Sequence, residues 1–444
     1  MHEQFSRYVE TIEANEWLSP VHQAQNQERL LQNLVRFAYE RSPFYRDRLA
    51  PLFLGHGIVD LSRWKEIPIL ERAAVFDHGP EMRAMDIPES FGPVGEFRTS
   101  GTLGTPLSVA VNGAVSTVAN ANIARLIGWF GFDRSSGMAS IRSYPGDPQS
   151  RYPHGYAGKG WLLGHAAPHY RLHVGTPIEQ QLEWLARVKA SYLRTYPSNA
   201  MALAEAVSPE QGRDLGIKMV IAFTETIPDG TRELVAERFG ARFASYYSCR
   251  EIGMIGIECP ELPQYHIAME NALVELVDDD GRAVTPGARG RVLVTGLNNY
   301  AMPFIRYALG DVAVEAISSC PCGRSLPVIE RVEGRVRNAF TFRDGTRVWP
   351  RGWLAREMRN FVPFRQYQMV QLDHERIEFR YVPDGTGRNA DLSGLTEYAK
   401  RMMHPSVEIS VVPMQTLPRA KSGKFEDFIS LVPAPAGTAA SLGP

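Results

Sequence analysis

The sequence is poor in cysteine, has no excess of either charge and contains no long apolar run. Four cysteines in 444 residues do not suggest a disulfide framework. Lys and Arg number 48 against 49 Asp and Glu, for a net charge of −1, so there is no electrostatic basis for binding nucleic acid or an anionic membrane. No apolar run reaches transmembrane length, and residues 1–4 lack the basic-then-apolar pattern of a signal peptide. We therefore expect a reduced, cytoplasmic location with no nucleic-acid or membrane partner, and the length predicts two or three domains.

A turn rich in hydroxyl groups and glycine occupies residues 99–106 and is followed by an alternating segment at 107–111 that predicts a β-strand. Glycines let the backbone approach a ligand and present its N–H groups, and Ser and Thr hydroxyls add donors. Such a turn suits a polyphosphate, although it lacks the Gly-Lys-Ser/Thr of a Walker loop. An ordinary hairpin turn is the alternative.

The middle of the chain predicts a parallel sheet. Residues 219–223 are typical of a buried strand, 229–239 of a helix and 241–247 of a second strand. Ligands gather at the carboxyl ends of parallel strands. Because Glu225 and Glu251 follow the two strands, both are candidate site residues.

Two earlier segments are less regular. Residues 179–207 predict a helical stretch interrupted at 196–198. Residues 141–173 are rich in Tyr, Trp and His interleaved with Gly and Pro, which predicts mostly loop. Such loops can line a ligand pocket, and they can equally be surface loops or an oligomer contact.

Five short motifs occur along the chain in a consistent order, at residues 99–106, 247–251, 307–311, 333–337 and 417–424. Together they resemble the adenylate-forming superfamily of acyl- and aryl-CoA synthetases, and most closely its phenylacetate-CoA ligase branch, over nearly the whole chain. The residues that the resemblance assigns to the β- and γ-phosphates of ATP are Thr99, Ser100, Gly101, Thr102, Gly104 and Thr105.

The resemblance also implies roles for residues of the later motifs. Tyr247 would stack on adenine, and Asp311 and Arg335 would hold the ribose. For Asp311, a salt-bridged turn is the alternative. Glu251 would ligate Mg²⁺, which prefers hard oxygen ligands. Lys424 would reach the α-phosphate and the substrate carboxylate and offset the charge that develops there.

Three positions depart from the family pattern. Thr105 stands where many relatives have lysine, Arg250 replaces the Thr or Ser of its motif, and Arg337 stands where Asp or Lys is usual. Arg250 places a cation beside the predicted Mg²⁺ ligand, where it can pair with a substrate carboxylate or phosphate; we count it with Lys424 and Glu251 as catalytic. Glu225 is grouped with the cofactor-binding residues.

The remaining cysteines predict a metal site. Cys320 and Cys322 form a tight pair, and Cys259 and His266 lie seven residues apart. Three cysteines and one histidine make a complete tetrahedral zinc set with no position open to water, and therefore a structural site. Some members of the resembled branch carry such a site. The alternative is buried free thiols. Cys249 is predicted to line a pocket, because no paired base marks it as a nucleophile.

The expected fold class is α/β. A large N-terminal domain at 1–336 would contain parallel sheets flanked by helices. A small mobile α+β domain at 337–432 would follow, with strands at 366–371 and 377–382, and then a disordered tail at 433–444. Movement of the small domain would allow ATP chemistry in one orientation and acyl transfer in another.

The expected activity is ATP-dependent ligation, with an acyl-adenylate formed first and a thioester with CoA second. ATP, Mg²⁺, CoA and a structural Zn²⁺ are the expected cofactors, and the aromatic residues of 144–170 favour an aryl acid. An amine, a hydroxyl or a carrier protein is the alternative acceptor, and a homodimer is consistent with the resemblance. A protein that sequesters an aromatic carboxylate without turnover is an alternative of another class.

Overall fold

The structure is a computed structural model that describes residues 2–54, 57–98, 107–147, 149–158, 160–162, 166–335, 338–348, 353–420 and 424–432. Across these ranges, every helix is too short or too polar to cross a membrane.

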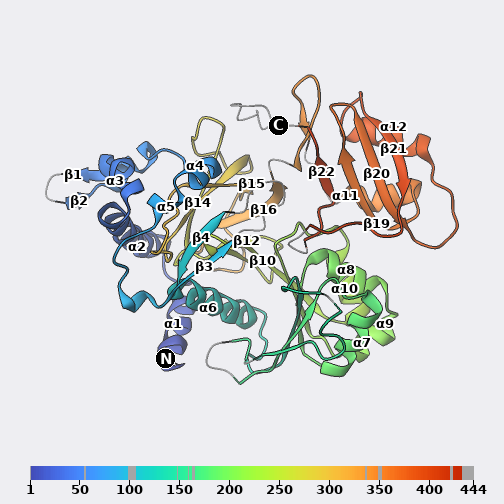
Figure 1. Ribbon diagram of the computed structural model, residues 1–444, viewed down its shortest axis with the longest axis horizontal. Coiled ribbons are helices and arrows are strands. Elements are labelled where there is room, and N and C mark those ends of the chain that lie inside the picture. Colours follow the sequence, from blue (N-terminus) through green and yellow to red (C-terminus); the bar gives the residue numbers. More distant parts are fainter. Residues whose placement is uncertain are drawn as a thin grey trace.

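One large mixed sheet organises most of the molecule (Figure 1). Its twelve strands lie in the order β13 (Ala272–Val277), β14 (Arg289–Gly296), β15 (Tyr307–Glu315), β16 (Val328–Arg335), β12 (Tyr265–Ile267), β11 (Gly253–Glu258), β10 (Arg242–Cys249), β9 (Met219–Phe223), β8 (Tyr192–Thr195), β5 (Met138–Arg142), β7 (His169–His173) and β6 (Tyr156–Gly158).

The predicted parallel sheet is confirmed only for part of this sheet. Neighbouring strands from β10 through β9, β8 and β5 to β7 run parallel. The remaining pairs, from β13 to β10 and at the β6 edge, are antiparallel. Short connections such as residues 250–252 between β10 and β11 are too short for the crossover that a parallel pair needs.

The strand–helix–strand prediction is confirmed, with β9 at the predicted bounds and α10 (Thr231–Phe239) between it and β10. The stretch 179–207 was predicted wrongly as interrupted helix. It holds α7 (Ile178–Val188), then the strand β8, then α8 (Pro197–Glu205). A four-residue strand that is almost wholly buried shows no alternation of polar and apolar residues, so its periodicity cannot be told from that of a helix.

Helices cover the sheet and divide its apolar residues into two large cores. α1 (His2–Asn15) and α6 (Gly113–Trp129) pack together over the core that includes the parallel strands. α2 (Pro20–Arg41) and α3 (Pro43–Leu49) cover the core of the antiparallel strands. α2 begins where Ser19 caps the His22 N–H and ends at Ser42, and its Leu34 is 0% exposed in that core.

A second sheet lies beside α8 and α10 (Figure 1). Its order is β21 (Glu408–Pro413), β20 (Arg376–Pro383), β19 (Phe364–Gln371) and β22 (Phe428–Ser430). With α11 (Trp353–Phe361) and α12 (Leu392–Met402), these strands form a third core. The strands predicted at 366–371 and 377–382 are confirmed. The domain boundary at 336/337 stays a prediction, and Arg337 and the tail at 433–444 lie outside the described residues.

Candidate active site

Three residues that are far apart in the sequence meet at the junction of β10, β15 and β16. Asp311 of β15 and Arg335 of β16 are paired across the strands, and Arg335 Nε lies 3.3 Å from Asp311 Oδ1. Tyr247 Oη donates a hydrogen bond to Asp311 Oδ2 at 2.7 Å. Burial, followed by the Asp311 charge, raises the pKa of Tyr247 well above its usual value, so the phenol stays protonated and keeps donating. The predicted adenine and ribose residues are therefore adjacent.

Glu251 lies in the turn that follows β10 and is 7% exposed. Arg72 at the start of α4 (Arg72–Asp77) approaches it, with Nη1 3.9 Å from Oε1. Nothing in the sequence around Glu251 predicted its contact with Arg72, because the two residues are far apart in the chain. Cys249 is next to Glu251, and burial followed by the Glu251 charge raises the pKa of its thiol well above the usual value. A neutral thiol agrees with pocket lining rather than nucleophilic catalysis.

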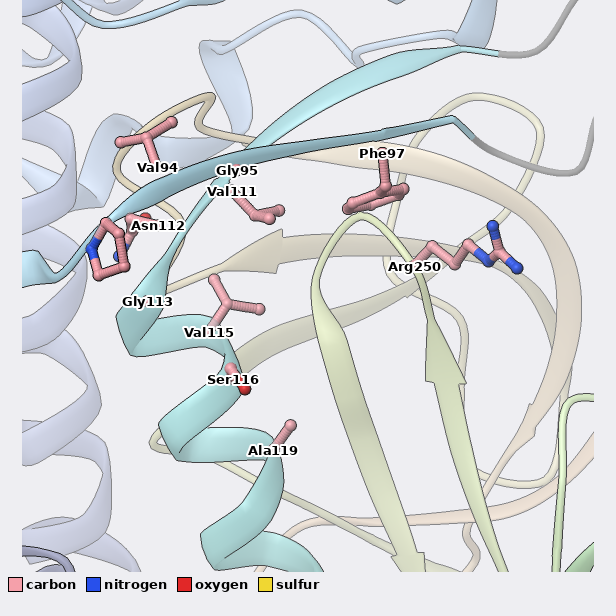
Figure 2. A pocket seen from close by; sticks show the side chains of 11 residues that line it. Val94, Gly95, Phe97, Val111, Asn112, Gly113, Val115, Ser116, Ala119 and Arg250 are labelled. Carbon is pink, nitrogen blue, oxygen red and sulfur yellow. The ribbon is translucent and has the colours of Figure 1, made fainter. Parts of the chain in front are cut away.

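Arg250 stands at one end of an apolar groove of about 380 Å³. Figure 2 shows Phe97 and Arg250 at this end and the first turn of α6 at the other. The groove is lined by Pro93, Val94, Gly95, Phe97, Val111, Asn112, Gly113, Val115, Ser116, Ala119 and Arg250. A cation beside an apolar groove can bind an amphipathic anion, which fits the predicted pairing of Arg250 with carboxylate or phosphate.

The predicted phosphate loop at 99–106 lies outside the described residues. Its two flanks are the antiparallel strands β3 (Val94–Arg98) and β4 (Ser108–Asn112), with Arg98 paired to Ser108. The predicted strand after the loop is confirmed. The loop therefore connects a hairpin, and the roles of its Ser, Thr and Gly residues stay predictions.

Glu225 contacts the C-terminal segment of the chain. Its side chain, only 4% exposed, accepts the Phe425 N–H at 2.6 Å through Oε1 and the Ser198 N–H at 3.2 Å through Oε2. Arg419 Nη1 lies 3.7 Å from Oε1 and donates to Ser198 Oγ at 3.0 Å. Glu225 thus anchors the segment that carries Lys424, a contact that its position after a strand could not indicate.

Charged residues of the site described above act electrostatically on Lys424. Burial lowers its pKa, as do the Arg335 and Arg250 charges, while Asp311 and Glu225 act in the opposite direction. The Lys424 carbonyl accepts the Ala420 N–H at 2.9 Å. The charges that act on Lys424 thus include those of Asp311 and Arg335, and its role stays a prediction.

The four candidate zinc ligands also come together. Cys259 follows β11, His266 lies in β12, and Cys320 and Cys322 precede β16; their ligand atoms all lie within 4.8 Å of one another. The Cys259 and Cys320 Sγ atoms are 3.5 Å apart, and Cys322 Sγ is 3.3 Å from His266 Nε2. A tetrahedral centre with Zn–S bonds of about 2.3 Å needs ligand atoms spaced at nearly these distances. The donor set fits zinc, and the two pairs lie close together in space although they are far apart in the sequence.

No family model matches the chain. It is 29% identical over 343 residues to a phenylacetate-coenzyme A ligase of Thermus thermophilus, which covers 73% of this chain and 72% of that protein. Among solved structures, a 2-hydroxyisobutyryl-CoA ligase in its postadenylation state with 2-HIB-AMP aligns with a TM-score of 0.74 at 18% identity, covering 94% of this chain and 91% of that one. The same ligase with 2-HIB-AMP and CoA in the thioesterification state gives a TM-score of 0.61 at 19% identity and the same coverage. These comparisons confirm the resemblance carried by the five motifs: in sequence and in fold, the chain is similar to adenylate-forming CoA ligases, and among them to a phenylacetate-CoA ligase.

Proposed function

We propose that the chain is an ATP-dependent acid–thiol ligase that activates a carboxylic acid as its acyl-adenylate and then transfers the acyl group to CoA. The observation that supports this proposal is that the charges of the paired Asp311 and Arg335 act on Lys424 of the C-terminal segment. A purely binding protein has no need to bring a lysine from a second sheet to this point.

The chemistry follows from the charges. In the first step a substrate carboxylate oxygen attacks the α-phosphorus of ATP, and pyrophosphate leaves with the electron pair of the broken P–O bond. The two reactants are both anions, so cations at the reacting atoms lower the barrier. Lys424 supplies such a cation, and Arg335 and Asp311 orient the ribose. In the second step the CoA sulfur attacks the acyl carbonyl, its thiol proton is lost, and AMP leaves.

Glu251 is the proposed carboxylate ligand for Mg²⁺, which supplies charge neutralisation of the phosphates when bound. Its buried carboxylate has an oxygen ligand to offer, and Arg72, at 3.9 Å, is beyond direct hydrogen-bond distance. Arg250, at the mouth of the groove, is proposed to pair with an anionic group of a substrate.

Cys259, His266, Cys320 and Cys322 are proposed to hold a structural Zn²⁺. The donor set is complete and three of the four residues are buried, which favours a closed site. The ligands join β11 and β12 to the segment before β16, so a metal here would tie together three parts of the antiparallel sheet.

Finer features also remain proposals. The aromatic residues between 144 and 170 favour an aryl acid, the low cysteine count favours the cytoplasm, and a homodimer is consistent with the resemblance. An amine, a hydroxyl or a carrier protein is the second candidate for the acceptor. Sequestration of an aromatic carboxylate is kept as the candidate from another class, because Thr105 and Arg250 depart from the family motifs.

The deciding experiment is ATP–pyrophosphate exchange with a panel of aryl, fatty and amino acids, followed by thioester detection with and without CoA. Exchange that depends on one acid is expected, and Lys424→Ala should abolish it. Lys400→Ala, at an exposed position of α12, is the matched control and should keep full exchange. A panel without exchange, combined with a melting temperature raised by an aromatic carboxylate, would instead favour sequestration.

A further inference from the structure

Three arginines gather on one face of the parallel strands, and we call Arg142, Arg171 and Arg194 the arginine cluster. Ser140 of β5 is paired with Arg171 of β7 on one side and with Arg194 of β8 on the other. Paired residues of parallel strands project to the same face, as do residues two apart in one strand. Arg142, two residues after Ser140, therefore shares this face.

Two members of the cluster, Arg142 and Arg194, contact aromatic rings. Within the described ranges, Arg142 and Arg194 form no ion pair with a carboxylate, and their contacts are aromatic. The Arg142 guanidinium lies 5.0 Å from the ring centroid of Tyr144. That of Arg194 lies 5.0 Å from the ring of Phe223 and donates a hydrogen bond to the Tyr246 hydroxyl.

Polar atoms at the aromatic contacts of Arg142 and Arg194 are buried without a hydrogen-bond partner among the described residues. They are Arg194 Nε and the Tyr144 hydroxyl, which belongs to the ring under Arg142. Buried polar atoms in folded proteins are nearly always paired, so unpaired ones call for an explanation such as a bound molecule. Both atoms can donate a hydrogen bond. Arg194 Nε belongs to a guanidinium, and the Tyr144 hydroxyl is on the ring that Arg142 covers, which indicates an anionic acceptor.

The positive charges of the cluster act on the neighbouring His169. Its Nε2 lies 2.9 Å from Ser140 Oγ. Burial first, and then the charges of Arg171, Arg194 and Arg142, lower the pKa of His169 to about 4. The imidazole is therefore neutral near pH 7 and can add a hydrogen bond without adding charge.

Tyr196 links the cluster electrostatically with residues that contact the C-terminal segment. Tyr196, at the end of β8, accepts the Ser143 N–H at 3.2 Å, and the charges of Glu225, Arg142 and Arg419 all act on its hydroxyl. The Tyr196 hydroxyl is therefore within electrostatic range of both Arg142 of the cluster and Arg419 of the segment that carries Lys424.

A row of aromatic rings runs from Tyr196 to the rings that Arg194 contacts. The rings of Tyr196 and Phe223 have centroids 5.3 Å apart, and Phe223 stacks on Tyr246 at 5.6 Å with an interplanar angle of 2°. A flat or extended apolar body would pack against these rings, with one end toward Lys424 and the other toward the cluster.

We propose that the arginine cluster binds a second anionic group on the substrate acid, so that the substrate is a dicarboxylic acid or a carboxylic acid with another anion at its far end. This inference rests on the proposed ligase function and names its substrate class. Guanidinium groups bind carboxylates and phosphates in the same way, so the phosphates of CoA are the other source of such an anion.

The test measures ATP–pyrophosphate exchange with a graded series of dicarboxylates, from succinate to suberate and including terephthalate, each compared with its monomethyl ester. The ester keeps the size and removes the second charge. The wild-type protein should prefer one diacid over its ester by about tenfold or more in kcat/KM, and Arg194→Gln should abolish most of that preference. Arg213→Gln, at an exposed position before β9, is the matched control.

Each of the other possible results either supports or overturns the proposed binding of a second anionic group. A wild-type preference for the ester, or a preference unchanged in Arg194→Gln, would overturn the inference. A raised KM for CoA in that variant, with the preference intact, would assign the cluster to the CoA phosphates. If Arg194→Gln does not fold, judged by its melting curve, Arg142→Gln takes its place. Exchange with benzoate or phenylacetate alone would refute the inference and leave the ligase function standing. If no acid supports exchange, the proposed ligase function fails. In that case, a diacid that raises the melting temperature of the wild-type protein but not of Arg194→Gln would still support the cluster as the binding site of the diacid.

Discussion

Glu225 should control adenylation through the segment that carries Lys424. Its carboxylate accepts two backbone N–H groups, from Phe425 and Ser198, and lies beside Arg419. Hydrogen bonds to a charged group each contribute about 1.5–3 kcal/mol. Glu225→Ala removes all of these contacts, while water that enters the gap replaces part of them. We therefore expect docking of the segment to weaken by about 3 kcal/mol, which corresponds to a loss of about 100-fold in adenylation rate.

The assay separates the two half-reactions. ATP–pyrophosphate exchange reports adenylation, and conversion of a preformed acyl-adenylate to the thioester reports transfer. Because the C-terminal segment is expected to move between the two steps, Glu225→Ala should reduce exchange about 100-fold while transfer falls far less. Arg419→Ala should share the loss, and the double variant should be less than additive because the residues touch one partner group.

Glu397→Ala, at an exposed position of α12, is the control that removes a carboxylate from the same region without touching this contact. Equal loss in both half-reactions would show that Glu225 serves general stability. Exchange retained within threefold in Glu225→Ala would refute the positioning role altogether.

Three further predictions concern metal, pH and packing. Atomic emission should find one zinc per chain, and Cys320→Ser should lose the metal and lower the melting temperature, because the site joins separate parts of the antiparallel sheet. Burial, followed by the Glu225 charge, raises the pKa of Asp427 to about 7. Because this pKa lies above the value in the unfolded chain, the native state binds more protons than the unfolded state. The free energy of unfolding should therefore fall as pH rises from about 4 to 7. Asp427→Asn should flatten that part of a melting-temperature profile, and an unchanged profile would contradict the assignment. Leu34→Ala should cost about 3 kcal/mol in chemical unfolding because the side chain is fully buried, whereas Leu392→Ala at an exposed position should cost under about 1 kcal/mol.

The sequence by itself determined the elements whose signals are local. The buried strand β9 was predicted at its observed bounds, and two of the four strands of the second sheet, β19 and β20, were predicted to within two residues. Apolar periodicity and turn residues act over short distances and so mark these elements locally. The order of the five motifs predicted the resemblance that the comparisons confirm. The residue types of Cys259, His266, Cys320 and Cys322 predicted a metal site before their distances were known.

Only the tertiary structure decided which residues from distant parts of the chain contact one another. β8 was missed because burial on both faces removes the alternation that marks a strand. Nothing in the sequence near Glu225 indicated Phe425, which lies two hundred residues later, and nothing near Glu251 indicated Arg72. The arginine cluster likewise exists only through the register of three parallel strands. Contacts between distant segments depend on how sheets and helices pack, and that information is spread over the whole chain rather than held in any one motif.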